Sequence, residues 1–359
     1  MPACNGKFLA KDFSPENRSE LSPALVGTTV FASSLILSAL TLTILRRFRV
    51  VDLPTPRSLH GGPTPRGGGV APALVGLGFC ALNPSAFGSL RNGLVLAAGG
   101  FALIGLAEDL RGFPPLARLF SQVVIASVAC HFLLSGTQSP WEGVGFLVAV
   151  AFLVSYLNAF NFMDGINGIS ATQVVVAGAA WVVTGALTDL DGLTQAGLVC
   201  ASAAAGFLPF NFPRARMFLG DAGSYFLGGW LGATVVWAVA RGAPPEALVA
   251  PLAVYLADTG FTLARRVARG EKWLQPHKTH IYQQLVALGW SHARVTLLVG
   301  AAMVACSLLG LASTGGSFAS RAVADLGICA LLTAYLAAPQ LIRTAHGSRS
   351  GHRPADAGA

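Results

Sequence analysis

Long apolar runs recur along the whole chain, and they constrain its fold more than any other feature. A helix needs about 20 apolar residues to cross a bilayer, and these runs are continuous, without the alternation of a membrane β-barrel. Only 11% of the residues are charged, against about 25% in soluble domains. The expected spans are 24–45, 68–87, 92–107, 116–134, 141–158, 171–187, 193–210, 222–240, 246–263, 295–313 and 322–342. The sequence therefore predicts an all-α polytopic membrane helix bundle with 10 or 11 transmembrane helices.

The distribution of basic residues predicts the orientation of these spans. If the first span ends in the cytoplasm at Arg46, then 18 of the 24 Lys and Arg residues lie on the cytoplasmic side. We expect an extracytoplasmic polar N-terminus at 1–23, a single polytopic membrane domain at 24–342, and a disordered cytoplasmic tail at 343–359. The net charge of +8 reflects this asymmetry and attraction to anionic lipid or phosphate, so nucleic acid is not expected as a partner.

Three acidic sites lie at the expected cytoplasmic ends of apolar runs. Glu108 and Asp109 end one run, Asp164 follows another, and Asp221 begins a third. An isolated acid at such a place usually caps a helix at the water interface. Three such sites, all on one side of the membrane, instead favour binding of Mg²⁺ together with phosphate.

Amides and glycines accompany Asp164. Asn158 and Asn161 precede it in three-residue steps, so on a helix the three side chains share one face. Asn167 follows it, between glycines that allow a ligand to approach the backbone. This pattern favours a ligand-binding turn at the end of a span.

A basic, glycine-rich segment follows the first span. It carries Arg57, His60 and Arg66 and runs into three consecutive glycines. Cations and exposed backbone N–H groups at a helix start can bind phosphate. Alone, such a segment is equally typical of a cytoplasmic anchor.

A second basic segment contains His277, Lys278 and His280. This arrangement can hold a diphosphate or move a proton. A zinc site is not expected, because no cysteine lies nearby and cations surround both histidines. Asp258, inside the preceding span, is expected to face the protein interior.

Taken together, these motifs resemble a known family, the polyprenyl-phosphate N-acetylhexosamine-1-phosphate transferases (glycosyltransferase family 4). The resemblance covers about residues 46–295. The motifs occur in family order: Asp52-Leu-Pro-x-x-Arg57-x-x-His60 with Pro65-Arg66-Gly67-Gly68, Gly105-Leu-Ala-Glu108-Asp109-Leu-Arg111, Asn158-Ala-x-Asn161-x-x-Asp164-Gly165-Ile-Asn167-Gly168, Phe218-Leu-Gly220-Asp221-Ala-Gly223-Ser224 and His277-Lys278-Thr-His280-Ile-Tyr282-Gln283.

The resemblance implies an enzyme of the bacterial inner membrane with its active site facing the cytoplasm. Its members transfer a sugar-1-phosphate from a UDP-N-acetylhexosamine to polyprenyl phosphate and release UMP. The implied cofactor is Mg²⁺, with Mn²⁺ as an alternative, and a homodimer is an expected assembly. On this basis the membrane domain at 24–342 is expected to be catalytic.

Carried over residue by residue, the resemblance makes Asp221 and Asp164 metal ligands and gives Asp164 a catalytic role as well. Glu108 and Asp109 match an acidic pair regarded as the base or organiser of the lipid phosphate, with Asp109 favoured. The implied substrate-binding residues are Arg57, His60, Arg66, Asn158, Asn161, Asn167, Phe218, His277, Lys278 and His280.

Three departures from the family pattern bear on the substrate. Glu108 replaces an aspartate, Asn167 stands where the peptidoglycan translocase has an acid, and the last motif lacks paired histidines. These variants resemble the branch that initiates O-antigen synthesis. The alternatives are the phospho-MurNAc-pentapeptide translocase and, in another class, a lipid or anion transporter, which would carry inverted repeats and charges at the middle of its spans.

Overall fold

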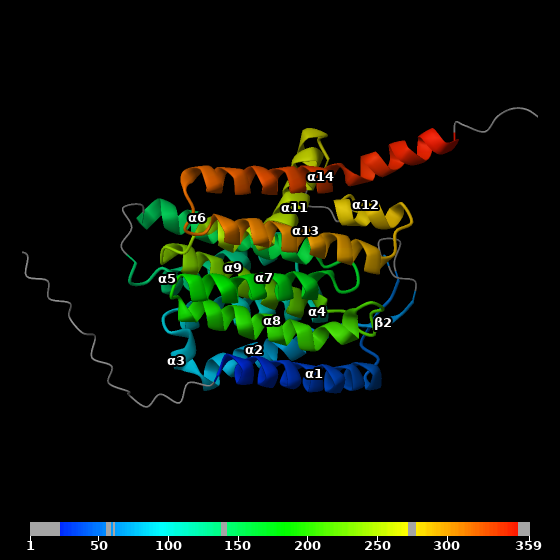
Figure 1. The fold of residues 1–359 in the computed structure, drawn as a ribbon. Coiled ribbons are helices and arrows are strands. Elements are labelled where there is room, and N and C mark those ends of the chain that lie inside the picture. The colour runs from blue at the N-terminus through cyan, green and yellow to red at the C-terminus, as the bar shows by residue number, and fades with distance from the viewer. Residues whose placement is uncertain (1–21, 55–58, 60–61, 138–141, 272–277, 351–359) are drawn as a thin grey trace, which may run out of the picture.

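The computed structural model describes residues 22–54, 59, 62–137, 142–271 and 278–350. The described chain is a bundle of roughly antiparallel helices, shown in Figure 1. Its helices are α1 (Pro23–Arg47), α2 (Val70–Leu82), α3 (Pro84–Phe87), α4 (Leu90–Arg111), α5 (Pro115–Leu133), α6 (Glu142–Met163), α7 (Ile169–Leu187), α8 (Asp191–Asn211), α9 (Gly220–Ala240), α10 (Pro245–Val249), η1 (Ala250–Leu252), α11 (Ala253–Ala268), α12 (Ile281–Ala287), α13 (His292–Ser313) and α14 (Phe318–Ser350). Two short strands, β1 (Val51–Asp52) and β2 (Thr64–Pro65), pair antiparallel.

Within the described residues, ten helical segments are long and apolar enough to cross a membrane. They include every expected span except 68–87, and α10, η1 and α11 together form one of them. The expected span at 68–87 is divided, because α2 ends at Leu82, Asn83 caps it, and Pro84 starts the separate helix α3. The prediction of an all-α polytopic bundle is confirmed. Of the expected spans, 68–87 is the one whose main helix, α2, is too short to be among these ten.

Helix α9 is the central element. In its most apolar window 94% of the residues are buried, against 17% in α14. Glycines allow its neighbours to approach closely: a Cβ on Gly105 of α4 would overlap the carbonyl oxygen of Asp221, and one on Gly229 would meet Phe101. These two glycines therefore allow α4 and α9 to pack closely at the centre of the bundle.

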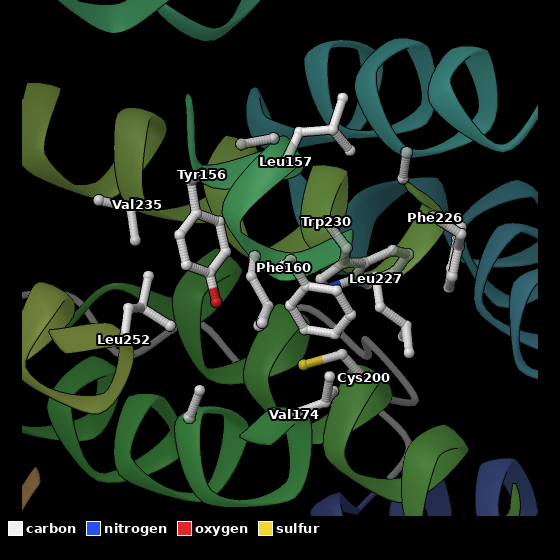
Figure 2. Close-up of a cluster of buried hydrophobic side chains, with 14 of the residues drawn as sticks. Tyr156, Leu157, Phe160, Val174, Cys200, Phe226, Leu227, Trp230, Val235 and Leu252 are labelled. Atoms are coloured by element: carbon white, nitrogen blue, oxygen red, sulfur yellow. The ribbon is translucent and has the colours of Figure 1, made fainter. Parts of the chain in front are cut away.

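The core is built where α6, α7, α8 and α9 meet. Figure 2 shows Tyr156, Phe160 and Trp230 within a cluster of buried apolar side chains. The indole N–H of Trp230 donates a 3.1 Å hydrogen bond to the carbonyl oxygen of Ala196 on α8. A buried polar group without a partner would cost free energy, so this bond fixes the position of α9 against α8.

The outer helices carry apolar side chains on their exposed faces. Examples are Ile36 and Leu40 on α1, Phe120 on α5 and Leu341 on α14. Exposed apolar side chains on spans of this length are compatible with lipid and costly in water. The chain is therefore a multi-pass membrane protein. Helix α14 continues to Ser350, past the expected start of the tail at 343.

Candidate active site

The loops that carry the acidic and basic motifs lie at one end of the bundle. Figure 1 shows the β1–β2 hairpin and α12 at that end, and α3 at the opposite end. A cavity of about 290 Å³ opens there, close to the size of a small-molecule site. Its lining is mainly polar and comes from the segment after α1, from the ends of α6 and α8 with the turns that follow them, and from the starts of α9, α12 and α13: Asp52, Leu59, Arg66, Asn161, Asp164, Gly165, Ile166, Asn167, Asn211, Phe218, Leu219, Gly220, Asp221, Gln283 and His292.

The segment after β2 docks onto the start of α9 through its backbone. The N–H of Phe218 donates to the carbonyl oxygen of Pro65 at 2.7 Å, and the N–H of Gly69 donates to that of Leu219 at 2.8 Å. A Cβ on Gly69 would overlap the Cα of Gly223. Only glycine permits this approach. The glycine run that was predicted to bind phosphate therefore has a structural role, because it lets the segment with Arg66 pack on the start of α9.

Arg66 lies at the centre of the acidic cluster. Its Nη2 lies 2.9 Å from Oδ2 of Asp221, its Nε 3.0 Å from Oδ1 of Asp109, and its Nη1 4.0 Å from Oδ1 of Asp52. Burial lowers the pKa of Arg66, but the carboxylates, Asp221 foremost, outweigh this and leave the pKa above its ordinary value. The guanidinium is thus a fixed positive charge that holds acids from three segments together.

Asp221 is fixed from its other side by α6. The amide nitrogen of Asn161 donates to Oδ1 of Asp221 at 3.0 Å and lies 2.9 Å from the hydroxyl of Ser224. Asn158 points elsewhere, donating to Oε1 of Gln122 on α5 at 2.8 Å, and it does not line the cavity. Of the two asparagines expected on one face of the helix, Asn161 therefore lines the cavity, whereas Asn158 makes a contact between α6 and α5.

Glu108 and Asp109 point to different partners, as expected for neighbours on a helix. Asp109 accepts hydrogen bonds from the backbone N–H groups of Asp221 and Ala222, at 3.1 Å and 2.9 Å, at the start of α9. Oε1 of Glu108 lies 3.4 Å from Nη1 of Arg118 on α5. These contacts give Asp109 an organising position behind Asp221, outside the cavity lining.

Asp164 follows α6 and is half-buried in the cavity wall. Burial is the main cause that raises the pKa of its carboxyl group, to about 7. Ser170 and Arg66 lower the pKa, while Asp221 and Asp109 raise it. Asp164 therefore exchanges its proton near neutral pH, unlike an ordinary aspartate.

The donor set agrees with the chemistry of a hard divalent cation. Carboxylate and amide oxygens of Asp221, Asp164 and Asn161 line one cavity, and Mg²⁺ prefers such ligands. Within the described residues, no group of three or more His, Cys, Asp or Glu side chains is placed to hold an ion. We expect substrate phosphates to complete the shell of such a cation, and Mg²⁺ or Mn²⁺ stays a prediction.

The basic motifs are only partly described. Arg57, His60 and His277 lie outside the described residues. Lys278 does not line the cavity, and neither does His280, which is buried with its Nδ1 3.1 Å from Oδ1 of Asp258. The structure thus places His280 at an internal polar contact beside the site.

Two cavity residues were missed by the sequence analysis. Asn211 accepts a hydrogen bond from the N–H of Gly168 at 2.7 Å and donates one to the carbonyl oxygen of Met217 at 2.9 Å, joining two loops. His292 starts α13 at the cavity edge. Both stand at the cavity end of an expected span, as the predicted acidic sites do, and this position is the signal that could have identified them.

Comparison with known proteins agrees with this geometry. The sequence model of glycosyl transferase family 4 matches residues 92–239, which include Glu108, Asp109, Asp164 and Asp221. A decaprenyl-phosphate N-acetylglucosaminephosphotransferase of Mycolicibacterium smegmatis is 32% identical over 318 residues, covering 77% of this chain and 78% of the relative. The chain belongs to glycosyl transferase family 4.

Other family 4 relatives carry two kinds of name. A decaprenyl-phosphate N-acetylglucosaminephosphotransferase of Mycobacterium leprae is 31% identical and covers 77% of this chain and 80% of its own length. A phospho-N-acetylmuramoyl-pentapeptide-transferase of Moorella thermoacetica is 29% identical and covers 81% of this chain and 97% of its own length. The two names differ in the sugar that they give, N-acetylglucosamine in one and N-acetylmuramoyl-pentapeptide in the other.

Proposed function

We propose that this family 4 protein transfers an N-acetylated sugar-1-phosphate from a UDP-sugar to polyprenyl phosphate and releases UMP. The observation that carries the proposal is the pairing of Arg66 with Asp109 and Asp221, beside a polar cavity that Arg66, Asp221 and Asp164 line at one end of a membrane bundle. The names of the relatives support the same reaction class.

In the proposed reaction, an oxygen of polyprenyl phosphate forms a bond to the sugar-bearing phosphorus of the UDP-sugar. The bond from that phosphorus to the bridging oxygen breaks, and UMP leaves with this oxygen. The second pKa of a phosphate monoester is about 6, so the nucleophile is largely ionised at neutral pH. The site therefore has to position the two phosphates and balance their charge more than it has to remove a proton.

The polar side chains of the cavity divide between these tasks. Asp221 and Asp164 would hold the cation, which supplies charge neutralisation for the diphosphate when bound. Arg66 pairs with Asp221 and Asp109 and can bind a diphosphate oxygen at the same place. Phe218 and Asn167 line the same cavity and offer an aromatic ring and an amide to a nucleotide base.

The lipid substrate is proposed to enter beside α5. Arg118 faces Glu108 there, and Leu116 and Phe120 are exposed on the same helix, where a polyprenyl chain can lie. Nε2 of Gln122 and the hydroxyl of Tyr225 are hydrogen-bond donors that are buried without a partner among the described residues. Such polar atoms are costly unless water or a ligand group satisfies them, and a lipid phosphate at Arg118 is suited to this.

The donor is proposed to be a UDP-N-acetylhexosamine, with UDP-N-acetylglucosamine first among the candidates because of the relatives' names. Initiation of O-antigen synthesis stays a prediction from Asn167 and the unpaired histidine motif. The phospho-MurNAc-pentapeptide translocase is the second candidate, since one such relative is matched over 97% of its length. We further propose the bacterial inner membrane as the location, with the cavity facing the cytoplasm.

The test uses the purified full-length chain in detergent with undecaprenyl phosphate and Mg²⁺. UDP-GlcNAc, UDP-QuiNAc, UDP-FucNAc and UDP-MurNAc-pentapeptide are offered in turn, and UMP release and the lipid product are measured. We expect UMP and lipid-diphospho-sugar in equal amounts with one UDP-N-acetylhexosamine. Turnover of UDP-MurNAc-pentapeptide alone would establish the second candidate, and absence of UMP with every donor would reject the reaction.

A further inference from the structure

Asp258 is a buried carboxylate within a membrane span that the proposed reaction does not use. Its side chain on α11 is fully buried. An acid at membrane depth is costly without partners, and it is retained where it organises a site or a pathway. Its partners therefore indicate its role.

The partners of Asp258 come mainly from the start of α12. Its Oδ1 accepts from the N–H of Ile281 at 2.9 Å and lies 3.1 Å from Nδ1 of His280. Its Oδ2 accepts from the N–H of Tyr282 at 3.3 Å. The carboxylate thus caps the otherwise open N–H groups at the start of this short helix, and its negative charge suits that end.

The remaining strong partner comes from α14. The hydroxyl of Tyr335 donates to Oδ2 of Asp258 at 2.7 Å, the shortest contact of this carboxylate. Figure 1 shows α14 along the outside of the bundle, next to α11 and α12. A peripheral helix is therefore tied through one buried acid to the segment that carries the last sequence motif.

Helix α12 reaches the cavity directly. Gln283 lines it, and the amide nitrogen of Gln283 donates to the hydroxyl of Tyr282 at 3.1 Å. That hydroxyl donates to the carbonyl oxygen of Phe162 at 2.9 Å, at the end of α6 and two residues before Asp164. A continuous series of hydrogen-bonded contacts thus runs from Tyr335 through Asp258 and α12 to the cavity wall.

We infer that Asp258 and Tyr335 are positioning residues that hold α12 so that Gln283 forms part of the donor-binding wall. On this inference, which rests on the proposed function for its kinetic readout, α14 is coupled to binding of the UDP-sugar. His280 then acts as part of this internal support and not as a ligand of the phosphates.

The variant that tests this is Tyr335→Phe, which removes one hydroxyl and keeps the ring. A hydrogen bond to a buried charged group is lost, so we expect KM for UDP-N-acetylglucosamine to rise about tenfold, with kcat changed less than about twofold because the acids near Arg66 are untouched. The matched control is Tyr156→Phe, since Tyr156 is also a fully buried tyrosine and its hydroxyl has no hydrogen-bond partner among the described residues.

A double-mutant cycle separates positioning from general destabilisation. If Tyr335 acts through α12, then Tyr335→Phe should add little to the KM of Gln283→Ala, whereas independent effects would multiply. Multiplying effects would overturn the inference, as would a KM for Tyr335→Phe equal to that of Tyr156→Phe.

Hydrogen–deuterium exchange supplies a readout that does not depend on turnover. Amides of 281–287 should exchange faster in Tyr335→Phe than in the wild type or in Tyr156→Phe, because the capped first turn loosens. Unchanged exchange at 281–287 would reject the inference even if the enzyme is active. If the wild type releases no UMP, the proposed function fails while the exchange result still decides this inference.

Discussion

The carboxylate of Asp109 accepts hydrogen bonds from the backbone N–H of Asp221 at 3.1 Å and of Ala222 at 2.9 Å. An acid at the end of α4 thus caps the start of α9, the most buried span, and fixes the residue that follows Gly220. Because Arg66 pairs with both Asp109 and Asp221, the same contacts balance the charge of the cluster. The placement of Asp221 in the cavity depends on this arrangement.

Replacing Asp109 with asparagine should lower UMP release by about a hundredfold, because the negative charge that holds Arg66 and caps α9 is lost. Thermal stability should fall as well. Glu108→Gln should cost less, since its pair with Arg118, at 3.4 Å, is longer than the 3.0 Å pair of Asp109 with Arg66, and Glu108→Asp should be tolerated. If Glu108→Gln proves the more damaging change, the roles of the two acids are reversed.

Asp221→Asn should abolish turnover at ordinary Mg²⁺ concentrations while the protein still inserts and purifies. The change keeps the shape of the side chain but removes the charge that faces Arg66 and the proposed cation. Asp191→Asn, in the first turn of α8 at the other end of the bundle, is the matched control and should retain activity. Near-normal activity of Asp221→Asn would remove this residue from the site.

Asp164 should make the stability of the protein depend on pH. Its pKa rises from the ordinary 3.8 to about 7 in the folded chain, mainly through burial. The folded state therefore keeps a proton that the unfolded chain releases, and stability is lost as pH rises between these two values. The melting temperature should fall from about pH 5 to about pH 8 more in the wild type than in Asp164→Asn.

Parallel pH profiles of the two proteins, measured by tryptophan fluorescence in detergent without added metal, would contradict this role of Asp164. Other titrating groups contribute equally to both profiles, so only the difference between them reports on this carboxyl group.

Gly69→Ala should disturb the docking of the Arg66 segment on α9. The added Cβ overlaps the backbone of Gly223, so we expect a loss of about 1–3 kcal/mol in stability together with lower activity. Gly78→Ala, within the helix α2 that follows Gly69, is the control, because nothing lies within 4 Å of its Cβ. It should be neutral or slightly stabilising. Equal melting temperatures for the two variants would show that the close approach at Gly69 is dispensable.

Reporter fusions should place the cavity in the cytoplasm. A cytoplasm-specific reporter after Ser350 should be active, and one inserted between Gly315 and Gly316, in the turn between α13 and α14, should be silent. The reason is the excess of Lys and Arg in the loops at the cavity end. The reverse pattern would invert the proposed orientation of the site.

The helix bundle could be predicted from the sequence alone, because spanning a bilayer requires long apolar runs that are visible residue by residue. The sequence also predicted that the acids and amides share one end of the bundle, since they stand at the ends of those runs. The division of the second expected span was not foreseen, although Asn83 and Pro84 mark the place where α2 stops. The family motifs added the expected reaction and the importance of Asp164 and Asp221.

The partners of these residues, by contrast, are known only from the tertiary structure. Arg66 meets Asp221 although 155 positions separate them, Asn158 turns to Gln122 instead of the cavity, and His280 is buried against Asp258. These contacts depend on the rotation of each helix and on the angles at which helices cross. Close contacts such as those at Gly69 and Gly105 set both. A local pattern places a side chain on a helix face, but packing of distant segments determines what that face meets.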